Sequence, residues 1–442
     1  MKSQTVFKSC SCLALVLACS ASVGCGAAGP GGSSSTGGTM STGGALSAAG
    51  AGGGSGGSVG GTGPASAGGT SRGGSAGAAG GFPAAGGKGG QGGTNPTGGG
   101  GGQAGASGPG GAAGSGGAGG SSGMGATGPC DIYQSANTPC VAAHSMVRAL
   151  YGSYSGNLYQ VRRASDKSTK DIPVIGPGGF VDSSVHETFC AGTTCTISYI
   201  YDQSPLKNDL PLSPPVHWLP NGGKEADAAP GKAKVGGHTV YGVYVQSDVG
   251  NTYRNNKATS TPTGDDAESI YMVADGKHFN GRCCFDYGNV ETSGNDDGAG
   301  TMETLEWGNI LNWSYGSGNG PWVMADLENG VFAGGVATGM VSVNTPLAAA
   351  YVTLMFKGPS GNHMTLKGGD AQSGSLAVKY DGARPPGYSP MHKKGAVELG
   401  TGGDGSAGGV GTFFEGAVTA GVPSDAIDDA VQANIVAAGY GR

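Results

Sequence analysis

The stretch Trp322-Val-Met-Ala-Asp-Leu-Glu-Asn-Gly330 alternates between two kinds of side chain. Successive residues of a β-strand point to opposite faces, so a strand over 322–328 places Val323, Ala325 and Leu327 on one face. The other face carries an aromatic ring, a thioether and two carboxylates, from Trp322, Met324, Asp326 and Glu328. The first face is suited to a hydrophobic core. The second is suited to binding a ligand or, as the simpler alternative, to facing solvent.

Other short runs show the same alternation and are separated by Gly, Asn, Asp and Pro. They predict strands over 239–246, 269–274, 350–357, 363–367, 375–380, 396–399 and 412–418. Two helices are predicted, over 141–151 after a Thr-Pro start and over 424–438, where Ser424 is the expected N-cap. Many strands and a few short helices predict an all-β fold, a β-sandwich of jelly-roll-like type.

The chain has ten cysteines, and the last six are Cys130, Cys140, Cys190, Cys195, Cys283 and Cys284. Their spacing contains no CxxC pair, which argues against a zinc site. Pairing between sequence neighbours predicts three local disulfides. A bridge between the adjacent Cys283 and Cys284 closes almost no loop, so loop-closure entropy gives little reason to keep it. Two interpretations remain: a rigid apolar sulfur surface for a ligand, or two thiols that are free or paired elsewhere.

Residues 1–25 have the pattern of an export signal, with Lys2 and Lys8 before an apolar run and small residues up to Cys25. Val16-Leu-Ala-Cys19 is close to a bacterial lipoprotein cleavage site, and Ser22-Val-Gly-Cys25 is a weaker candidate. We therefore expect an exported protein, either secreted after ordinary cleavage or held at the cell surface by a lipid anchor in the membrane. Export also supplies the oxidising compartment that disulfides need.

Residues 26–128 consist almost entirely of Gly, Ala, Ser and Thr, with Arg72 and Lys88 as their only charges. Such a segment cannot bury enough apolar surface to fold, so it is predicted to be a disordered linker before a folded domain at 129–442. All 30 Asp and Glu but only 20 of the 24 Lys and Arg lie in that domain, so its formal charge is −10. This charge argues against nucleic acid as a partner and suits neutral polysaccharides better.

A further acidic residue, Asp404, lies in the Gly-rich stretch 398–412. Glycines allow the backbone to approach a ligand closely, so this loop could present Asp404 to a substrate. The alternative is a flexible hairpin tip. Two oxygen-rich turns, 263–268 and 294–298, lack the ligand spacing of an EF-hand, and we predict no metal site.

Several long blocks of the chain, in order, resemble the catalytic domain of glycoside hydrolase family 54, the α-L-arabinofuranosidase B type. The resemblance covers essentially the whole of the predicted folded domain. The blocks are Gly128-Pro-Cys-Asp-Ile-Tyr133, Thr138-Pro-Cys-Val-Ala-Ala-His144, Leu158-Tyr-Gln-Val-Arg-Arg163, Phe189-Cys-Ala-Gly-Thr-Thr-Cys195, Tyr253-Arg-Asn-Asn256, Cys283-Cys-Phe-Asp-Tyr-Gly-Asn289, Pro321-Trp-Val-Met-Ala-Asp-Leu-Glu-Asn-Gly330 and Val431-Gln-Ala-Asn-Ile-Val436.

The resemblance implies a retaining exo-α-L-arabinofuranosidase that removes terminal α-L-arabinofuranosyl groups from arabinan or arabinoxylan, without a cofactor. It implies that Glu328 is the nucleophile and Asp404 the general acid/base. Such an enzyme needs the two carboxyl groups roughly 5–5.5 Å apart, and an ionised Glu328 is expected to keep Asp404 protonated. The implied substrate-binding residues, including the disulfide as part of the sugar-binding wall, are Asp326, Asn329, Trp313, Gly403, Cys283 and Cys284.

Two features depart from the family pattern. Gly405-Ser406 follows Asp404 where relatives carry more polar, Asn-rich loops, which leaves the setting of this acid open. Relatives also usually continue into an arabinose-binding β-trefoil, whereas this sequence ends at Arg442. We therefore expect polymer targeting to come from the tether, from a partner, or not to occur at all. The rival hypotheses are a non-catalytic carbohydrate-binding surface lipoprotein and a glycosidase that also accepts β-D-xylosides. We expect a monomer.

Overall fold

The computed structural model describes residues 127–442. The predicted export signal, almost all of the predicted linker, and the lipidation candidates Cys19 and Cys25 lie outside the described residues. No helix within 127–442 is both long enough and apolar enough to cross a bilayer.

Two large sheets form the centre of the fold. The first has seven strands, in the spatial order β1 (Cys140–Ser145), β22 (Gly411–Ala420), β11 (Glu268–Asp275), β18 (Tyr351–Gly358), β19 (Met364–Asp370) and β20 (Ala377–Gly382), with β9 (Val243–Val245) paired to β22. The second has eight, in the order β10 (Tyr253–Asn255), β21 (Ala396–Leu399), β12 (Asp286–Val290), β13 (Glu303–Gly308), β15 (Trp322–Asp326), β16 (Val331–Phe332), β14 (Ser314–Gly316) and β17 (Gly339–Val341).

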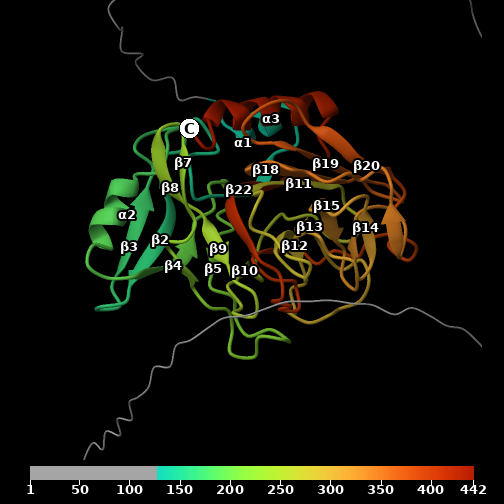
Figure 1. Ribbon diagram of the computed structural model, residues 1–442, viewed down its shortest axis with the longest axis horizontal. Helices are drawn as coiled ribbons and strands as arrows, with labels where there is room; N and C mark the ends of the chain where they lie inside the picture. The colour runs from blue at the N-terminus through green and yellow to red at the C-terminus, as the bar shows by residue number, and fades with distance from the viewer. Residues whose placement is uncertain (1–126) are drawn as a thin grey trace, which may run out of the picture. The chain divides into compact units, whose positions relative to one another are not determined.

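Two smaller sheets adjoin this sandwich. The five-stranded one has the order β3 (Thr169–Pro173), β2 (Asn157–Arg163), β4 (Cys195–Ile200) and β5 (Leu210–Pro211), with β6 (Ala226–Asp227) paired to β4. The two-stranded one pairs β7 (Lys232–Val235) with β8 (His238–Tyr241). The short helix α2 (Ser183–Phe189) lies beside them, at the left of Figure 1.

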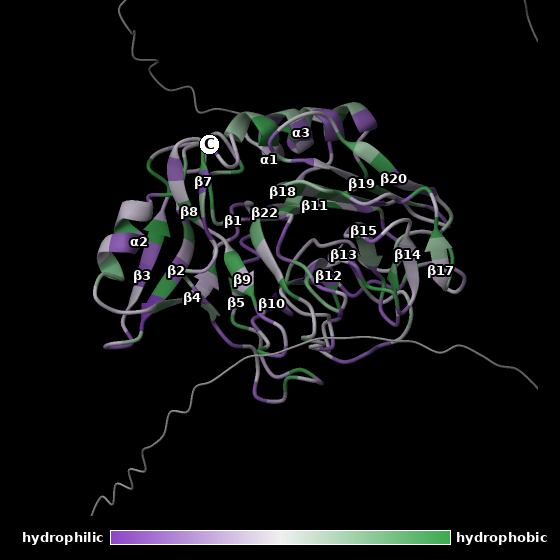
Figure 2. Cartoon of the chain, viewed as in Figure 1, coloured by the Kyte–Doolittle hydropathy of each residue, from purple (hydrophilic) through white to green (hydrophobic). Residues whose placement is uncertain are grey.

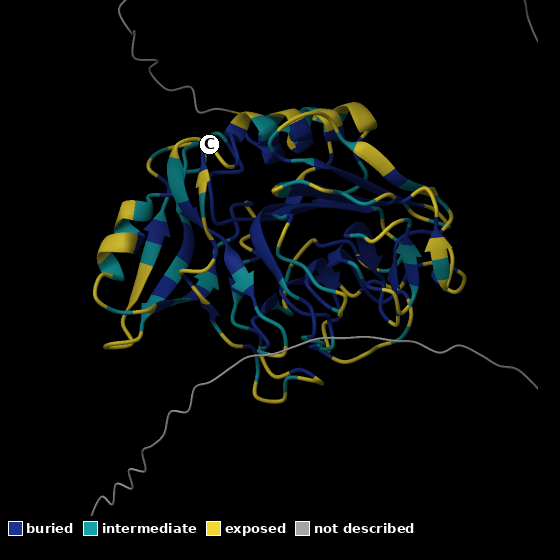
Figure 3. Ribbon diagram, viewed as in Figure 1, coloured by how far each residue is buried: buried dark blue, intermediate teal, exposed yellow. Residues whose placement is uncertain are grey.

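The layers are helix, sheet and sheet. Helices α1 (Pro129–Ser135) and α3 (Asp425–Ala438) cover one face of the seven-stranded sheet, and the eight-stranded sheet lies against the other face (Figure 1). Figure 2 shows that α3 mixes hydrophobic and hydrophilic residues, as expected of a helix that covers a sheet. In Figure 3, buried residues dominate the strands of the two large sheets, and exposed residues gather in loops and on α2 and α3. The predicted all-β sandwich is confirmed.

The alternation of side chains in 322–330 correctly predicts which face of the strand packs into the core. Val323, Ala325 and Leu327 belong to the main hydrophobic core. The opposite face is only partly as predicted, because Trp322 and Met324 do not face a ligand. Their side chains are buried in a second, smaller cluster with Ile310, Val331, Ala333 and Val341. The strand also ends at Asp326, before Glu328.

The predicted helix over 141–151 is wrong. Residues 140–145 form β1, which pairs with β22, and all six residues are buried. A strand covered on both faces has no alternation of apolar and polar residues, so its Val-Ala-Ala run could not be distinguished from a helix by periodicity. The predicted strand over 239–246 is divided at Gly242 into β8 and β9, which belong to different sheets.

The remaining predicted strands are β11, β18, β19, β20, β21 and β22. The predicted bounds of β21 are correct, and the other five strands are shifted or extended by a few residues. The second predicted helix is α3. Helices α1 and α2, of seven residues each, are too short for a periodic pattern and were missed. The three disulfides join the expected neighbours, 130 to 140, 190 to 195 and 283 to 284.

Helix α3 is attached to the sheet by charged groups as well as apolar ones. The Nζ atoms of Lys357 and Lys367 lie 2.8 and 2.7 Å from Asp428 Oδ2, and both lie 2.6 Å from Asp425 Oδ1. The side chain of Asp428 is fully buried, whereas that of Asp425 is 75% exposed. The same two lysines therefore meet one buried and one exposed carboxylate.

This difference predicts unequal effects on stability. Asp428→Asn should lower the free energy of unfolding by about 3–5 kcal/mol, because it removes the buried negative charge that pairs with two buried lysine ammonium groups. Asp425→Asn, the matched control, should cost at most about 1 kcal/mol, because an exposed ion pair is screened by water. Urea unfolding of the two variants measures both values. Equal losses would contradict the assignment of Asp428 as the main attachment.

Candidate active site

All eight residues that the sequence analysis assigned to substrate or catalysis line one cavity of about 130 Å³. They come from segments far apart in the sequence, which meet beside the eight-stranded sheet. The cavity is lined by Cys283, Cys284, Asp296, Trp313, Asp326, Glu328, Asn329, Gly330, Gly402, Gly403, Asp404 and Ser406. The structure therefore brings together every predicted site residue. Asp296, Gly330, Gly402 and Ser406 are additional.

Glu328 lies in a tight turn directly after β15. Glu328 and Asn329 both have left-handed backbones, with φ of 66° and 57°, a conformation that costs a non-glycine residue roughly 1–2 kcal/mol. Several contacts hold the turn. Leu327 N donates to Gly330 O at 3.1 Å, Glu328 N donates to Asp326 Oδ1 at 3.1 Å, and the Tyr388 hydroxyl donates to Glu328 O at 2.8 Å. The turn directs the carboxyl group of Glu328 into the cavity instead of along the strand.

Asp404 is held in place by its own loop. Ser406 donates to Asp404 Oδ1 through its backbone N at 2.9 Å and through its hydroxyl at 2.7 Å. The indole Nε1 of Trp218 donates to Asp404 Oδ2 at 2.8 Å. Gly402, Gly403 and Gly405 around it are buried. The alternative of a flexible hairpin tip is therefore wrong, and Ser406, whose effect the sequence left open, orients the acid.

The paired sulfurs of Cys283 and Cys284 form one wall of the cavity. Their Sγ atoms lie 3.5 and 3.2 Å from Asp326 Oδ2. A disulfide has no S–H to donate, so this contact does not stabilise an ionised Asp326. Burial, and then the negative charge of Glu306, raises the pKa of Asp326 well above its usual range. Asp326 is thus suited to hold a proton and to donate a hydrogen bond.

Position 403 has no room for a side chain, because a second buried acid, Glu291, lies against it. A Cβ on Gly403 would overlap Oε2 of Glu291, whose side chain is fully buried just after β12. The other oxygen, Oε1, accepts a hydrogen bond from the Thr301 hydroxyl at 2.6 Å. Glu291 therefore lies immediately behind the cavity wall.

Glu328, Glu291 and Asp326 form a cluster of like charges. Burial first, then the negative charges of Glu291 and Asp326, raises the pKa of Glu328 to about 11. Burial also raises the pKa of Glu291. In the free site, burial and the neighbouring carboxyl groups thus favour a protonated Glu328 by raising its pKa, whereas the sequence analysis expects an ionised one. Burial is the larger cause of the raised pKa, and Glu291, which no local sequence pattern had indicated as a neighbour, adds to it.

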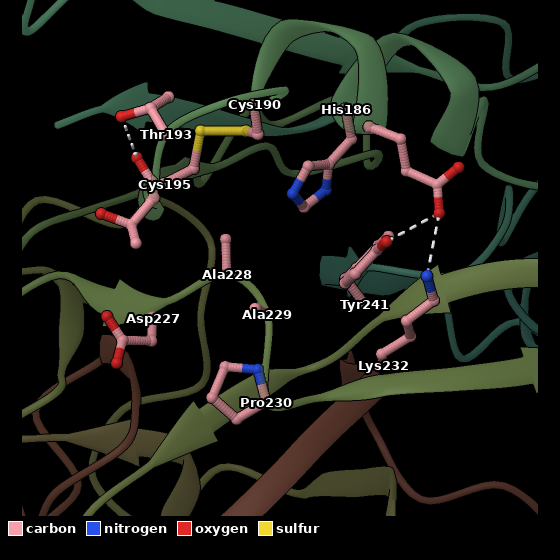
Figure 4. Close-up of a pocket in the computed structure, with 12 residues that line it drawn as sticks. His186, Cys190, Thr193, Cys195, Asp227, Ala228, Ala229, Pro230, Lys232 and Tyr241 are labelled. Carbon is pink, nitrogen blue, oxygen red and sulfur yellow. Dashed lines mark hydrogen bonds and ion pairs between the residues drawn. A yellow bond between two sulfur atoms is a disulfide. The ribbon is translucent and has the colours of Figure 1, made fainter. Parts of the chain in front are cut away.

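A larger cavity, of about 500 Å³, lies elsewhere, beside α2 and β8 (Figure 4). It contains none of the predicted site residues. Its floor includes Tyr241 and the disulfide Cys190–Cys195. The carboxylate of Glu187 there accepts hydrogen bonds from the Tyr241 hydroxyl at 2.8 Å and from Lys232 Nζ at 3.1 Å. Size alone therefore does not identify the candidate active site.

Sequence reasoning missed four residues at the site, namely Trp218, Glu291, Asp296 and Ser406. Asp296 accepts a hydrogen bond from Asn329 Nδ2 at 3.0 Å, so the oxygen-rich turn 294–298 contributes to the site. Of these four residues, only Trp218 had a local signal in the sequence, because it is an aromatic residue in a Pro- and Gly-rich loop. Nothing local distinguishes Glu291 or Ser406.

Comparison with known proteins gives a consistent result. Residues 129–441 match the family described as α-L-arabinofuranosidase B, catalytic. The α-L-arabinofuranosidase B of Aspergillus oryzae is 49% identical over 323 residues, which cover 71% of this chain and 63% of the relative. That of Emericella nidulans is 50% identical over 322 residues, covering 71% and 62%. The chain thus spans less than two thirds of the length of these relatives.

Solved structures show the same similarity. An arabinofuranosidase complexed with arabinofuranosyl-α-1,2-xylobiose is 48% identical, with a TM-score of 0.69, covering 71% of this chain and 66% of the other. The same values hold for a Glu→Gln variant of a family 54 α-L-arabinofuranosidase soaked with 4-nitrophenyl α-L-arabinofuranoside.

The raised pKa of Glu328 predicts a pH-dependent stability. An ordinary glutamate has a pKa of 4.5, and the folded-state value is about 11, so between these values folding takes up a proton. Stability should then fall as pH rises, by at most about 1.4 kcal/mol per pH unit. Glu328→Gln carries no such proton and should unfold at a higher temperature than the unaltered protein, by a margin that grows from pH 5 to pH 8.

Thermal unfolding across this pH range measures the margin. Asp227→Asn, which removes an exposed acid outside the cluster, is the control and should leave the pH dependence unchanged. A constant difference between Glu328→Gln and the unaltered protein would show that the cluster takes up no proton on folding.

Proposed function

Because the chain belongs to the α-L-arabinofuranosidase B family of glycoside hydrolases, we propose that it is a retaining exo-α-L-arabinofuranosidase. It would remove terminal α-L-arabinofuranosyl groups from arabinan or arabinoxylan. The observation that carries this proposal is the single small cavity that contains both Glu328 and Asp404. Its volume of about 130 Å³ suits one sugar ring, and an enzyme that encloses only one ring removes terminal groups.

We assign Glu328 as the nucleophile and Asp404 as the general acid/base. Glu328 attacks the anomeric carbon, and Asp404 protonates the departing glycosidic oxygen and then takes a proton from the incoming water. The two carboxyl groups enter the cavity on separate turns, one after β15 and one in the loop before β22. This arrangement supports attack and protonation from different sides of the bound sugar.

Glu328 must be ionised when it attacks. Glu291 and Asp326 both have raised pKa values, so either can hold the proton in place of Glu328. The transition state is an oxocarbenium-like cation, and a group of carboxyls with one net negative charge stabilises it electrostatically. Asp326 and Asn329 are proposed to bind sugar hydroxyls, while Trp313 and the disulfide wall supply apolar surface.

The proposed substrates are arabinose-containing plant polysaccharides or their oligosaccharides. A related arabinofuranosidase was solved with arabinofuranosyl-α-1,2-xylobiose, which supports arabinoxylan fragments as candidates. We also propose export to the outside of the cell, on the strength of residues 1–25.

Two substitutions test the roles. Asp404→Asn should lower turnover of an arabinofuranosyl oligosaccharide by roughly 10²–10⁴-fold, because a sugar leaving group needs protonation. It should lower the first step on 4-nitrophenyl α-L-arabinofuranoside less, since nitrophenolate leaves without a proton. Glu328→Gln should abolish both activities. Steady-state and burst kinetics measure these losses, and NMR of the first product should show retained anomeric configuration.

Asp227→Asn is again the control and should keep full turnover. Near-normal activity of Glu328→Gln or Asp404→Asn would reject the assigned role. Sugar binding by the unaltered protein without any cleavage would instead favour the non-catalytic carbohydrate-binding alternative.

A further inference from the structure

A second cavity adjoins the first. It has a volume of about 290 Å³ and is lined by His217, Trp218, Asn295, Asp296 and Asp404. Asp296 and Asp404 also line the smaller cavity, so the two spaces share a wall that contains the assigned acid/base. A group bonded to a sugar in the first cavity, on the side of Asp404, would extend into the second.

Trp218 is unusual in being both exposed and fixed. The residue is 62% exposed, yet its indole Nε1 donates to Asp404 Oδ2 at 2.8 Å and its backbone N donates to Asp404 O at 2.9 Å. The His217 ring packs edge-on against the indole, with centroids 4.5 Å apart, and His217 N donates to Gly294 O at 2.9 Å. A ring fixed in this way loses little further freedom when a ligand stacks on it.

The surroundings restrict the kind of ligand. Asp296 and Asp404 lie at the junction of the cavities, and no Lys or Arg lines either of them. An anionic group such as a uronic acid would face like charges and no cation. A neutral sugar ring instead offers an apolar C–H face for the indole and hydroxyl groups for Asn295, His217 and Asp296.

We propose that the second cavity is the subsite for the leaving sugar, a neutral pentose ring that stacks on Trp218. The inference rests on the proposed function, because it assumes that Asp404 protonates the bond between the two sugars. Trp218 then has two effects: its ring binds the leaving sugar, and its N–H keeps Asp404 Oδ2 directed toward the glycosidic oxygen. It is a specificity-determining and positioning residue.

Substrates with and without a leaving ring separate these effects. Methyl α-L-arabinofuranoside has no leaving ring for Trp218 to stack on, but its cleavage still needs protonation by Asp404. Cleavage of arabinofuranosyl-α-1,2-xylobiose needs Asp404 and also offers a leaving ring to Trp218. The readout is the ratio of kcat/KM for the oligosaccharide to kcat/KM for the methyl glycoside. In Trp218→Ala this ratio should fall by about tenfold or more, mainly through KM for the oligosaccharide.

Trp218→Phe keeps a ring and loses only the N–H. It should retain most of the ratio while lowering kcat on both substrates and changing the pH profile. Ile175→Ala, which alters a residue that is 60% exposed and outside both cavities, is the control and should behave as the unaltered protein. Repeating the measurement with arabinofuranosyl-arabinose shows whether a xylose or an arabinose leaving ring depends more on Trp218.

The outcomes are distinct. If the unaltered protein cleaves neither glycoside, the proposed function fails. If it cleaves both and Trp218→Ala leaves the ratio unchanged, the subsite is wrong and the function stands. Should Trp218→Ala not fold, crystals of Glu328→Gln soaked with arabinofuranosyl-α-1,2-xylobiose decide the question. A xylose ring against Trp218 supports the subsite, and a ring directed elsewhere overturns it.

Discussion

The geometry of the site depends on one buried cation. Arg254, on β10, is 1% exposed, and its guanidinium lies 2.5 Å from Glu398 on the neighbouring strand β21. The same guanidinium donates hydrogen bonds to the backbone oxygens of Gly403 and Glu291. It thus connects the loop that carries Asp404 and the end of β12 to the edge of the sheet. Only arginine has enough donors in a fixed plane to make these contacts together.

This attachment explains why the site can contain so many carboxyl groups. Glu291, Asp326 and Glu328 repel one another when ionised, and repulsion alone would separate the segments that carry them. Arg254 pairs with Glu398 and holds the backbone at Glu291 and at Gly403, while the left-handed turn fixes Glu328. The fold therefore maintains an arrangement that the acids by themselves oppose, which is characteristic of a site organised for catalysis.

Sequence patterns predicted the sandwich and the members of the site better than the contacts within it. All three strands β1, β15 and β21 are buried at every position. Alternation still identified β15 and β21 because an acidic residue, Asp326 or Glu398, marks one face of each, but it failed for β1, whose Val-Ala-Ala run has no such mark. All eight predicted site residues meet in one cavity. Most of them were predicted from the resemblance to a known family and not from local patterns. The positions of Glu291 behind Gly403 and of Trp218 against Asp404 depend on segments distant in the chain. No local pattern carries that information.

The exposed indole of Trp218 has a practical consequence for spectroscopy. The chain contains four tryptophans; Trp307 and Trp322 are 1% exposed, and Trp313 is partly buried. Trp218 therefore emits at the longest wavelength and is the first to be reached by a neutral quencher such as acrylamide. Because this ring also bonds to Asp404, its fluorescence offers a label-free signal from the mouth of the site, in a protein that needs no introduced probe.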